Sequence, residues 1–338
     1  MNSSITEILY VTREIAWLPW AVQYFFLIGL SVGCFLLSLP GLALGRAEWM
    51  KPGRLALIGA LTCGLVAPVA LLADLHQPGR FLNFYLHPQA TSWMSWGAFF
   101  IPLYLAGLLV YAWAALYRCA GGTAVKAAAL VTGLGAALVM LYTGVEVMVV
   151  AARPLWHSPF VPLQFAATAL AGSIGLVLVF NRILGGGDPG AEVALNRTLA
   201  RTLAAVLAIG VLWMLLALSG FSNTHSQALA QVASSPSWQL TAVWAVTATL
   251  VPLVLAWKRP AGTGVLTGLI AIHSAWMFRW TIFIGGQDIP KTGAGFYDYH
   301  LPLGPEGLLG IVGTAGLWLA VLILLTSVLP RSNPAKGV

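Results

Sequence analysis

Long apolar blocks recur along the whole chain and restrict it to one class of fold. We place nine of them, separated by short polar or Gly- and Pro-rich joints, at about 17–44, 55–75, 93–117, 125–152, 160–181, 202–220, 238–257, 262–284 and 305–329. Crossing ~30 Å of hydrocarbon takes roughly 20 apolar residues in a helix that rises about 1.5 Å per residue. Because only 8% of the 338 residues are charged and 59% are hydrophobic, a soluble domain is excluded.

Backbone chemistry decides which membrane fold these blocks adopt. Lipid offers no hydrogen-bond partners to peptide groups, so a spanning segment must be a helix or part of a closed barrel. The blocks are continuous apolar runs without two-residue alternation, which predicts helices. We therefore predict an all-α, polytopic membrane protein with nine transmembrane helices. The first block lacks a short apolar region followed by a small-residue cleavage site, so we expect a retained helix and no removed signal peptide.

The distribution of basic residues predicts the topology. With nine crossings the two termini lie on opposite sides of the membrane. One side would carry Arg46, Lys51, Arg54, Arg118, Lys126, Arg182, Arg197, Arg201, Lys258, Arg259, Arg331 and Lys336, and the other only Arg13, Arg80, Arg153 and Lys291. Because cytoplasmic loops are the basic ones, we expect a periplasmic N terminus and a cytoplasmic C terminus. The net charge of +7 thus reflects topology, since the basic residues form no nucleic-acid-binding stripe.

The joints suggest how the chain is divided. Short connections make the first four helices a natural antiparallel front bundle. We expect a periplasmic N-terminal segment over 1–16, a front bundle with the functional site over 17–180 and a Gly-rich cytoplasmic linker over 181–201. A rear bundle over 202–330 and a cytoplasmic tail over 331–338 complete the chain.

One stretch places ionisable groups inside an apolar span. In LYTGVEVMVVAARPLW (141–156), Tyr142, Glu146 and Arg153 are spaced by four and seven residues, which puts them on one face of a helix. Ionisable groups in membrane helices cost several kcal/mol unless they face a cavity or a partner, so they indicate function. Two structural alternatives are a protonated Glu146 that ties two helices together and a local pair with Arg153.

Further polar and aromatic side chains are expected at similar depth on the three preceding helices. They are, in chain order, Gln23, Tyr24, Asp74, His76, Arg80, Trp93 and Trp96. Taken alone, His76 could be a histidine at the membrane interface, and the tryptophans could belong to an interfacial aromatic belt. Four consecutive helices that supply polar groups at one depth favour a ligand cavity instead, because a single buried pair would not require them.

The inventory of this cavity fits quinol, a flat lipid-soluble ring that releases protons when it is oxidised. We expect catalytic roles for three residues: Glu146 accepts a proton, and Asp74 and His76, nearer water, pass it on. The predicted cofactor-binding residues are Tyr142, Gln23, Tyr24, Arg80, Arg153 and Trp96. No metal ligand set is predicted, since Cys34, Cys63 and Cys119 show no paired spacing and read as packing residues.

The chain offers no redox centre to take the electrons. A b-type haem between helices usually needs two axial histidines at membrane depth, and only His273 of six histidines is clearly mid-helix, so we expect no haem. Iron–sulfur clusters need more thiolates than three cysteines provide. An electron acceptor would therefore belong to another polypeptide.

Several elements, in order and spacing, resemble the NrfD/polysulfide reductase membrane-anchor family. They are WLPWAVQYFFLIGL (17–30), LLADLHQPGRF (71–81), HPQATSWMSWGAFF (87–100), YTGVEVMVVAARPLW (142–156) and RWTIFIGGQDIPK (279–291). The resemblance implies the anchor subunit of a periplasmic molybdopterin oxidoreductase in the bacterial inner membrane. Such an anchor oxidises menaquinol or a related quinol near the periplasmic face. It passes electrons to a ferredoxin-like subunit with four [4Fe-4S] clusters and then to a molybdopterin guanine dinucleotide catalytic subunit.

The resemblance also implies particular quinone contacts. In related anchors these come from the outer part of the first helix and from the tyrosine of the fourth, which match Gln23 or Tyr24 and Tyr142 here. Family members carry His or Asn on the first helix where this chain has Gln23 and Tyr24. Nine helices also exceed the eight of smaller members, so the ninth is an addition in a subset of the family.

Other interpretations stay open at this point. A proton- or ion-translocating protein without a redox role would need ionisable groups that continue to the inner face, where the helices are almost bare of them. A passive tether would leave Glu146 and its neighbours without a purpose. For Arg279 we expect a structural role, either pairing with Asp288 or holding a docked subunit through residues 287–291. A second ligand site in the rear bundle is the alternative.

Overall fold

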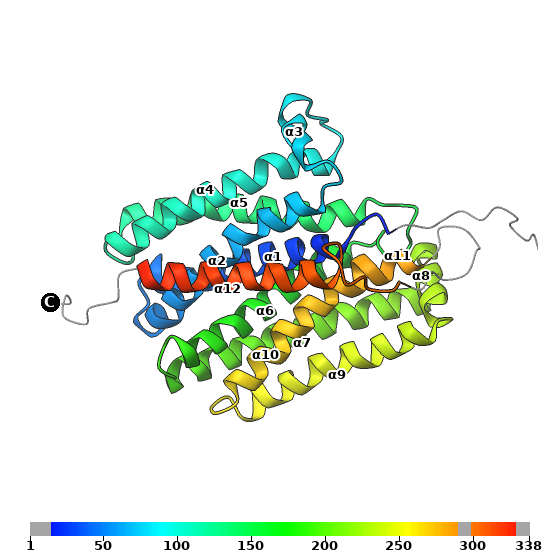
Figure 1. Cartoon of the computed structure of the whole chain (residues 1–338). Helices are drawn as coiled ribbons and strands as arrows, with labels where there is room; N and C mark the ends of the chain where they lie inside the picture. Colours follow the sequence, from blue (N-terminus) through cyan, green and yellow to red (C-terminus); the bar gives the residue numbers. More distant parts are fainter. Residues whose placement is uncertain (1–14, 290–298, 329–338) are drawn as a thin grey trace, which may run out of the picture.

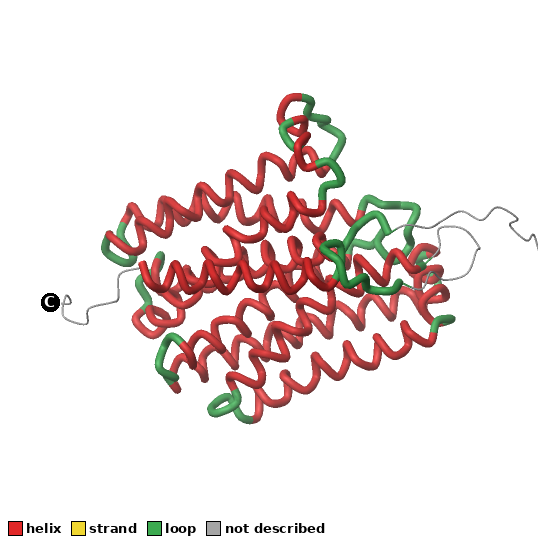
Figure 2. Tube along the Cα trace, in the orientation of Figure 1, coloured by secondary structure: helices red, strands yellow, loops and turns green. Residues whose placement is uncertain are grey.

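The computed structural model describes residues 15–289 and 299–328, and all regular structure within those ranges is helical. Figures 1 and 2 show the long helices lying side by side in one bundle. The predicted N-terminal segment 1–16, except its last two residues, lies outside the described residues. The predicted tail 331–338 and Lys291 lie outside them too.

The long helices correspond to the predicted apolar blocks. They are α1 (Pro19–Leu42), α2 (Met50–Asp74), α4 (Trp93–Tyr117), α5 (Thr123–Met148), α6 (Phe160–Ile183), α7 (Pro189–Ser219), α9 (Pro236–Lys258), α10 (Gly264–Trp280) and α12 (Leu308–Val328). Short helical elements fill the connections: η1 (Ala47–Trp49), η2 (Pro78–Arg80), α3 (Asn83–Leu86), α8 (Asn223–Ala233), the π-helix η3 (Thr281–Gly285) and α11 (Gly286–Asp288).

Within the described ranges, eight helices are long and apolar enough to cross a membrane. The predicted multi-pass membrane protein is confirmed at this level. Helix α10 has 17 residues, and η3 and α11 continue it to Asp288. The ninth crossing at 262–284 and the sidedness of the termini stay predictions.

Helix α1 lies at the centre of the bundle, because it packs against α2, α6, α10 and α12. Small residues permit close contact: the Ser173 hydroxyl on α6 donates to the Leu30 carbonyl on α1 at 3.0 Å. Helix α12, which was expected among the rear helices, packs against α2 and α1, as Figure 1 shows in red. Its Trp318 stacks on Phe180 of α6 with ring centroids 6.3 Å apart.

The predicted linker 181–201 is largely helical. Helix α6 continues to Ile183, and α7 begins at Pro189. Asp188 caps α7 by accepting from the Ala191 amide at 3.1 Å, and Pro189 suits the first helical position. That bond, helped by Lys51 at 3.3 Å, lowers the pKa of Asp188. The true joint is therefore only the Gly-rich turn that carries the chain from α6 to this cap.

One end of the bundle carries the longest connections, and we call it the long-loop end. Helices α2 and α5 end there and α1, α4 and α6 begin there. It also holds α3, which lies at the top of Figure 1, and α8, which lies at the right. All the predicted site residues lie at or near this end.

Candidate functional site

Three predicted residues meet in the interior near the long-loop end. The side chains of Tyr24, Tyr142 and Glu146 are 0%, 3% and 8% exposed. Tyr24 projects from α1, and the other two project from α5 one helical turn apart. Each of the three lies close enough to the other two to interact electrostatically. The four-residue spacing thus points both α5 side chains at α1 and not at lipid.

Asp74 extends this cluster toward the end of the bundle. It closes α2 and interacts with Glu146 on one side and His76 on the other. It also lies near the amides of Leu18 and Ala21 at the start of α1, where free N–H groups and the helix dipole favour a carboxylate. His76 itself is exposed. A continuous series of ionisable side chains therefore leads from the buried tyrosines to the surface.

The cluster contains polar atoms without partners. Gln23 Nε2, Tyr24 Oη, Asp74 Oδ1 and Glu146 Oε2 are buried and make no hydrogen bond of ordinary geometry within the described part of the chain. More than 90% of buried polar groups in proteins are paired, and each unpaired one costs about 1–3 kcal/mol. Four of them from three helices therefore form a set of donors and acceptors that suits a polar ring or ordered water.

Helix α4 contributes its backbone to this site. A methyl group at Gly97 would overlap the ring of Tyr142, so only glycine lets that ring lie flat against α4. The predicted Trp96 faces away: its indole donates to the Ala90 carbonyl at 2.9 Å and stacks on Phe100, and 44% of it is exposed. The sequence had singled out the tryptophans of this motif, whereas its glycine makes the contact.

We expect Gly97→Ala to destabilise the protein by about 1–3 kcal/mol, the usual cost of overpacking, because the Tyr142 ring must move. Gly133→Ala is the matched control, since nothing lies within 4 Å of a methyl group there and alanine favours a helix by up to about 1 kcal/mol. Thermal unfolding in detergent compares the two variants. Equal melting temperatures would contradict the close contact between Gly97 and Tyr142.

Two predicted basic residues lie away from the cluster. Arg80 is exposed and donates to the Gln77 side chain at 2.8 Å. Arg153 donates to the carbonyls of Gly286 and Ile289 at 2.7 and 3.0 Å. Burial lowers the pKa of Arg153, and nearby Asp288 opposes that shift. Arg153 thus binds the backbone of the segment that follows η3. The sequence had predicted that it contacts a cofactor, which is a different role.

Arg279 is the most deeply buried charged side chain described, at 1% exposure. Its guanidinium donates to the Thr168 hydroxyl at 2.7 Å and to the carbonyls of Phe165 and Ala275 at 2.9 Å each. A longer contact of 3.4 Å reaches the carbonyl of Phe25. Arg279 therefore ties α10 to α6 and α1. The structural role was expected, but these carbonyl and hydroxyl partners were not.

Gln287 is a structural residue that the sequence did not reveal. Its side-chain oxygen accepts from the amides of Ala16 and Trp17 at 2.9 and 3.1 Å. Its side-chain nitrogen donates to the carbonyls of Trp17 and Phe283 at 3.0 and 2.9 Å. In the sequence, the only indication of this role was that Gln287 is a polar residue in a Gly-rich turn. Through Gln287, α11 holds the start of α1 at the long-loop end.

Comparison with known proteins assigns the family. The profile described as "Polysulphide reductase, NrfD" matches residues 10–291. The chain belongs to the NrfD family. This match confirms the resemblance that the motifs in α1, α2, α4, α5 and α10 had indicated. The eight helices that could cross a membrane agree with a membrane-protein family.

Three proteins of similar sequence come from different organisms. The chain is 36% identical to a tetrathionate reductase subunit of Salmonella typhimurium, over 96% of this chain and 95% of that protein. It is 31% identical to a selenate reductase subunit of Mesobacillus selenatarsenatis, over 30% and 24% of the two chains. A putative dimethyl sulfoxide reductase membrane subunit of Halobacterium salinarum is 26% identical over 48% and 42%. All three names denote subunits of reductases.

Among the described residues, no group of three or more His, Cys, Asp or Glu side chains could hold a metal ion. The cluster around Glu146 combines Tyr, Gln, Glu, Asp and His side chains, which can form hydrogen bonds and exchange protons. That inventory suits an organic ligand with hydroxyl groups.

Proposed function

We propose that this NrfD-family chain is the membrane subunit of a tetrathionate reductase-like complex and that it oxidises quinol at the cluster of Tyr24, Tyr142 and Glu146. Menaquinol is the proposed substrate. The electrons pass to a ferredoxin-like subunit with four [4Fe-4S] clusters and from there to a molybdopterin catalytic subunit. The 36% identity to the tetrathionate reductase subunit over nearly the whole chain supports this assignment of the complex.

The proposed orientation follows from the distribution of basic residues. Nine crossings of the bacterial inner membrane, with α10, η3 and α11 as the eighth, put the N terminus and the long-loop end on the periplasmic side. The partner subunits would dock there, close to the cluster. Protons released on oxidation then leave on the side where Asp74 and His76 lie.

The proposal rests on one observation. Ionisable side chains form a connected series from the buried, unpaired polar atoms of the cluster around Glu146 to the surface. Bound quinol supplies two electrons and two protons. Gln23 Nε2 and Tyr24 Oη, which are buried and unpaired, orient the ring from α1. Glu146 Oε2 accepts the two protons one after the other, and the interactions of Glu146 with Asp74 and of Asp74 with His76 lead each proton outward before the next is taken up.

A reconstituted complex tests the function. The chain is purified with the subunits encoded beside it, and oxidation of a soluble naphthoquinol is followed with tetrathionate as acceptor. We expect quinol oxidation to require this chain. A reduced dye should still donate electrons directly to the soluble subunits and support tetrathionate reduction without it. Quinol oxidation at the same rate without the membrane subunit would overturn the proposal.

We expect Tyr142→Phe to raise the apparent KM for quinol about three- to tenfold, the value of one hydrogen bond of about 0.5–1.5 kcal/mol. The substitution removes a hydroxyl and keeps the ring against Gly97. Tyr111→Phe is a matched control, because Tyr111 is a buried tyrosine whose hydroxyl meets the Ser38 hydroxyl at 2.9 Å away from the cluster. An unchanged KM for Tyr142→Phe would exclude its hydroxyl from quinol binding.

A further inference from the structure

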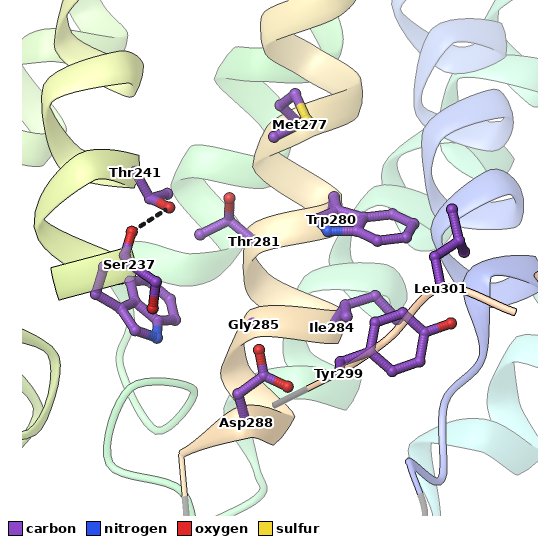
Figure 3. A pocket seen from close by; sticks show the side chains of 11 residues that line it. Ser237, Thr241, Met277, Trp280, Thr281, Ile284, Gly285, Asp288, Tyr299 and Leu301 are labelled. Carbon is purple, nitrogen blue, oxygen red and sulfur yellow. Dashed lines mark hydrogen bonds between the residues drawn. The ribbon is translucent and has the colours of Figure 1, made fainter. Parts of the chain in front are cut away.

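A second candidate site lies among the rear helices. A cavity of about 230 Å³ opens between the start of α9, the end of α10 with η3 and α11, and residues 299–301. Figure 3 shows Trp280 and Tyr299 on one side, Ser237 and Thr241 on the other, and Asp288 reaching in from below. It shares no residue with the cluster around Glu146. None of the functions assigned above uses it.

The helix wall of this cavity is irregular. Immediately after Trp280 the backbone passes into the π-helix η3, a form that is rare and occurs frequently at functional sites. Gly285 ends this turn, and a methyl group there would lie 3.2 Å from the Trp238 ring. The absence of a side chain at Gly285 thus lets the indole of α9 lie close against η3. The π-helix and the close approach of Trp238 to it therefore shape this wall of the cavity.

The lining is electronegative. Of the described residues that line the cavity, Asp288 alone carries a formal charge, and none of them is a lysine or arginine. The faces of Trp238, Trp280 and Tyr299 carry negative quadrupole potential. Arg153 interacts with Asp288 but does not line the cavity, and its Nη1 donates to two carbonyls. A carboxylate accepts up to about four hydrogen bonds, so Asp288 can serve Arg153 and a ligand together.

This charge pattern discriminates between ligand classes. A carboxylate repels the carbonyl oxygens of a quinone, and it offers a quinol hydroxyl a hydrogen bond but no opposite charge. An ammonium group gains both a charge-assisted hydrogen bond to Asp288 and cation–π contact with the rings. The hydroxyls of Ser237 and Thr241 add acceptors on the opposite wall. The cavity therefore favours a cationic amine.

The depth of the cavity indicates where the amine comes from. Trp238 lies in the first turn of α9 and Trp280 is the last residue of α10, the positions at which interfacial aromatic residues meet lipid head groups. We propose that this cavity binds the primary ammonium head group of a phospholipid such as phosphatidylethanolamine. The proposal is independent of quinol oxidation, since it uses other residues.

Native mass spectrometry of the whole protein tests the site. The protein is exchanged into phosphatidylglycerol nanodiscs with a small fraction of phosphatidylethanolamine or its N-acetylated form, and retained lipids are counted after release. We expect one retained phosphatidylethanolamine and about tenfold weaker retention of the uncharged form. Asp288→Asn should weaken retention of phosphatidylethanolamine about tenfold as well, whereas Asp288→Glu should restore most of it.

The control is Glu306→Gln, which removes an exposed carboxylate outside the cavity and should retain phosphatidylethanolamine like the native protein. Melting temperatures show whether each variant is folded. If Asp288→Asn does not fold, the comparison of the two lipids on the native protein decides alone. Equal retention of both lipids would overturn the proposal, and displacement by millimolar ethanolamine would overturn the lipid as the source of the amine.

Discussion

Replacement of Glu146 by Gln is expected to slow quinol oxidation by the assembled complex about 100-fold, the lower range for loss of a general base. Glutamine keeps the size and the hydrogen-bonding capacity of the side chain but cannot take up a proton. Because Glu146 links Tyr142 to Asp74, the change interrupts the only series of ionisable side chains that we trace from the cluster to the surface. The rate with a soluble naphthoquinol is the measurement.

Controls separate this effect from a loss of structure. Glu48→Gln removes an exposed carboxylate near the start of α2 and should leave the rate unchanged. The soluble subunits should co-purify equally well with both variants. An unaltered rate with Glu146→Gln would remove this residue from the mechanism. Loss of the partner subunits would assign Glu146 to the alternative role of a tie between helices.

Arg279→Ala is expected to lower the free energy of unfolding by about 3 kcal/mol. The change leaves a large cavity, which costs about 2–5 kcal/mol for a big buried side chain, and removes the bonds to the Thr168 hydroxyl and the Phe165 carbonyl of α6. Relief from burying a charge offsets part of this cost. Thermal unfolding in detergent measures the change.

Two further variants sharpen the Arg279 experiment. Arg279→Lys keeps the charge but lacks the planar fork that reaches several acceptors at once, so we expect it to recover less than half of the lost stability. Arg201→Ala removes an exposed arginine of α7 and should leave the melting temperature unchanged. An Arg279→Ala protein as stable as the native one would contradict the tie between α10, α6 and α1.

The sequence predicted best those features that depend on local periodicity. The apolar runs located the long helices, and the four-residue spacing placed Tyr142 and Glu146 on one face. Asp74 ends its apolar block, and this position predicted that it lies at a depth similar to that of Glu146. Each of these inferences needs only the geometry of one helix and the length of the span.

Features that depend on tertiary contacts were not predictable in this way. Arg153 shares the helical face of Glu146 in a regular helix, but α5 ends at Met148, so the chain turns and Arg153 meets the segment after η3. Trp96 was expected in the cavity, whereas its neighbour Gly97 makes the contact. The early start of α7 was missed because its first turns are polar, although Asp188 followed by Pro189 is a recognisable start signal.

Gln287 gives the fold a mechanical link that spans the whole sequence. It hydrogen-bonds the backbone of Ala16 and Trp17, and the next residue, Leu18, lies near Asp74. A protein that binds α11 would therefore contact the chain within a few residues of the outer end of the proposed proton path.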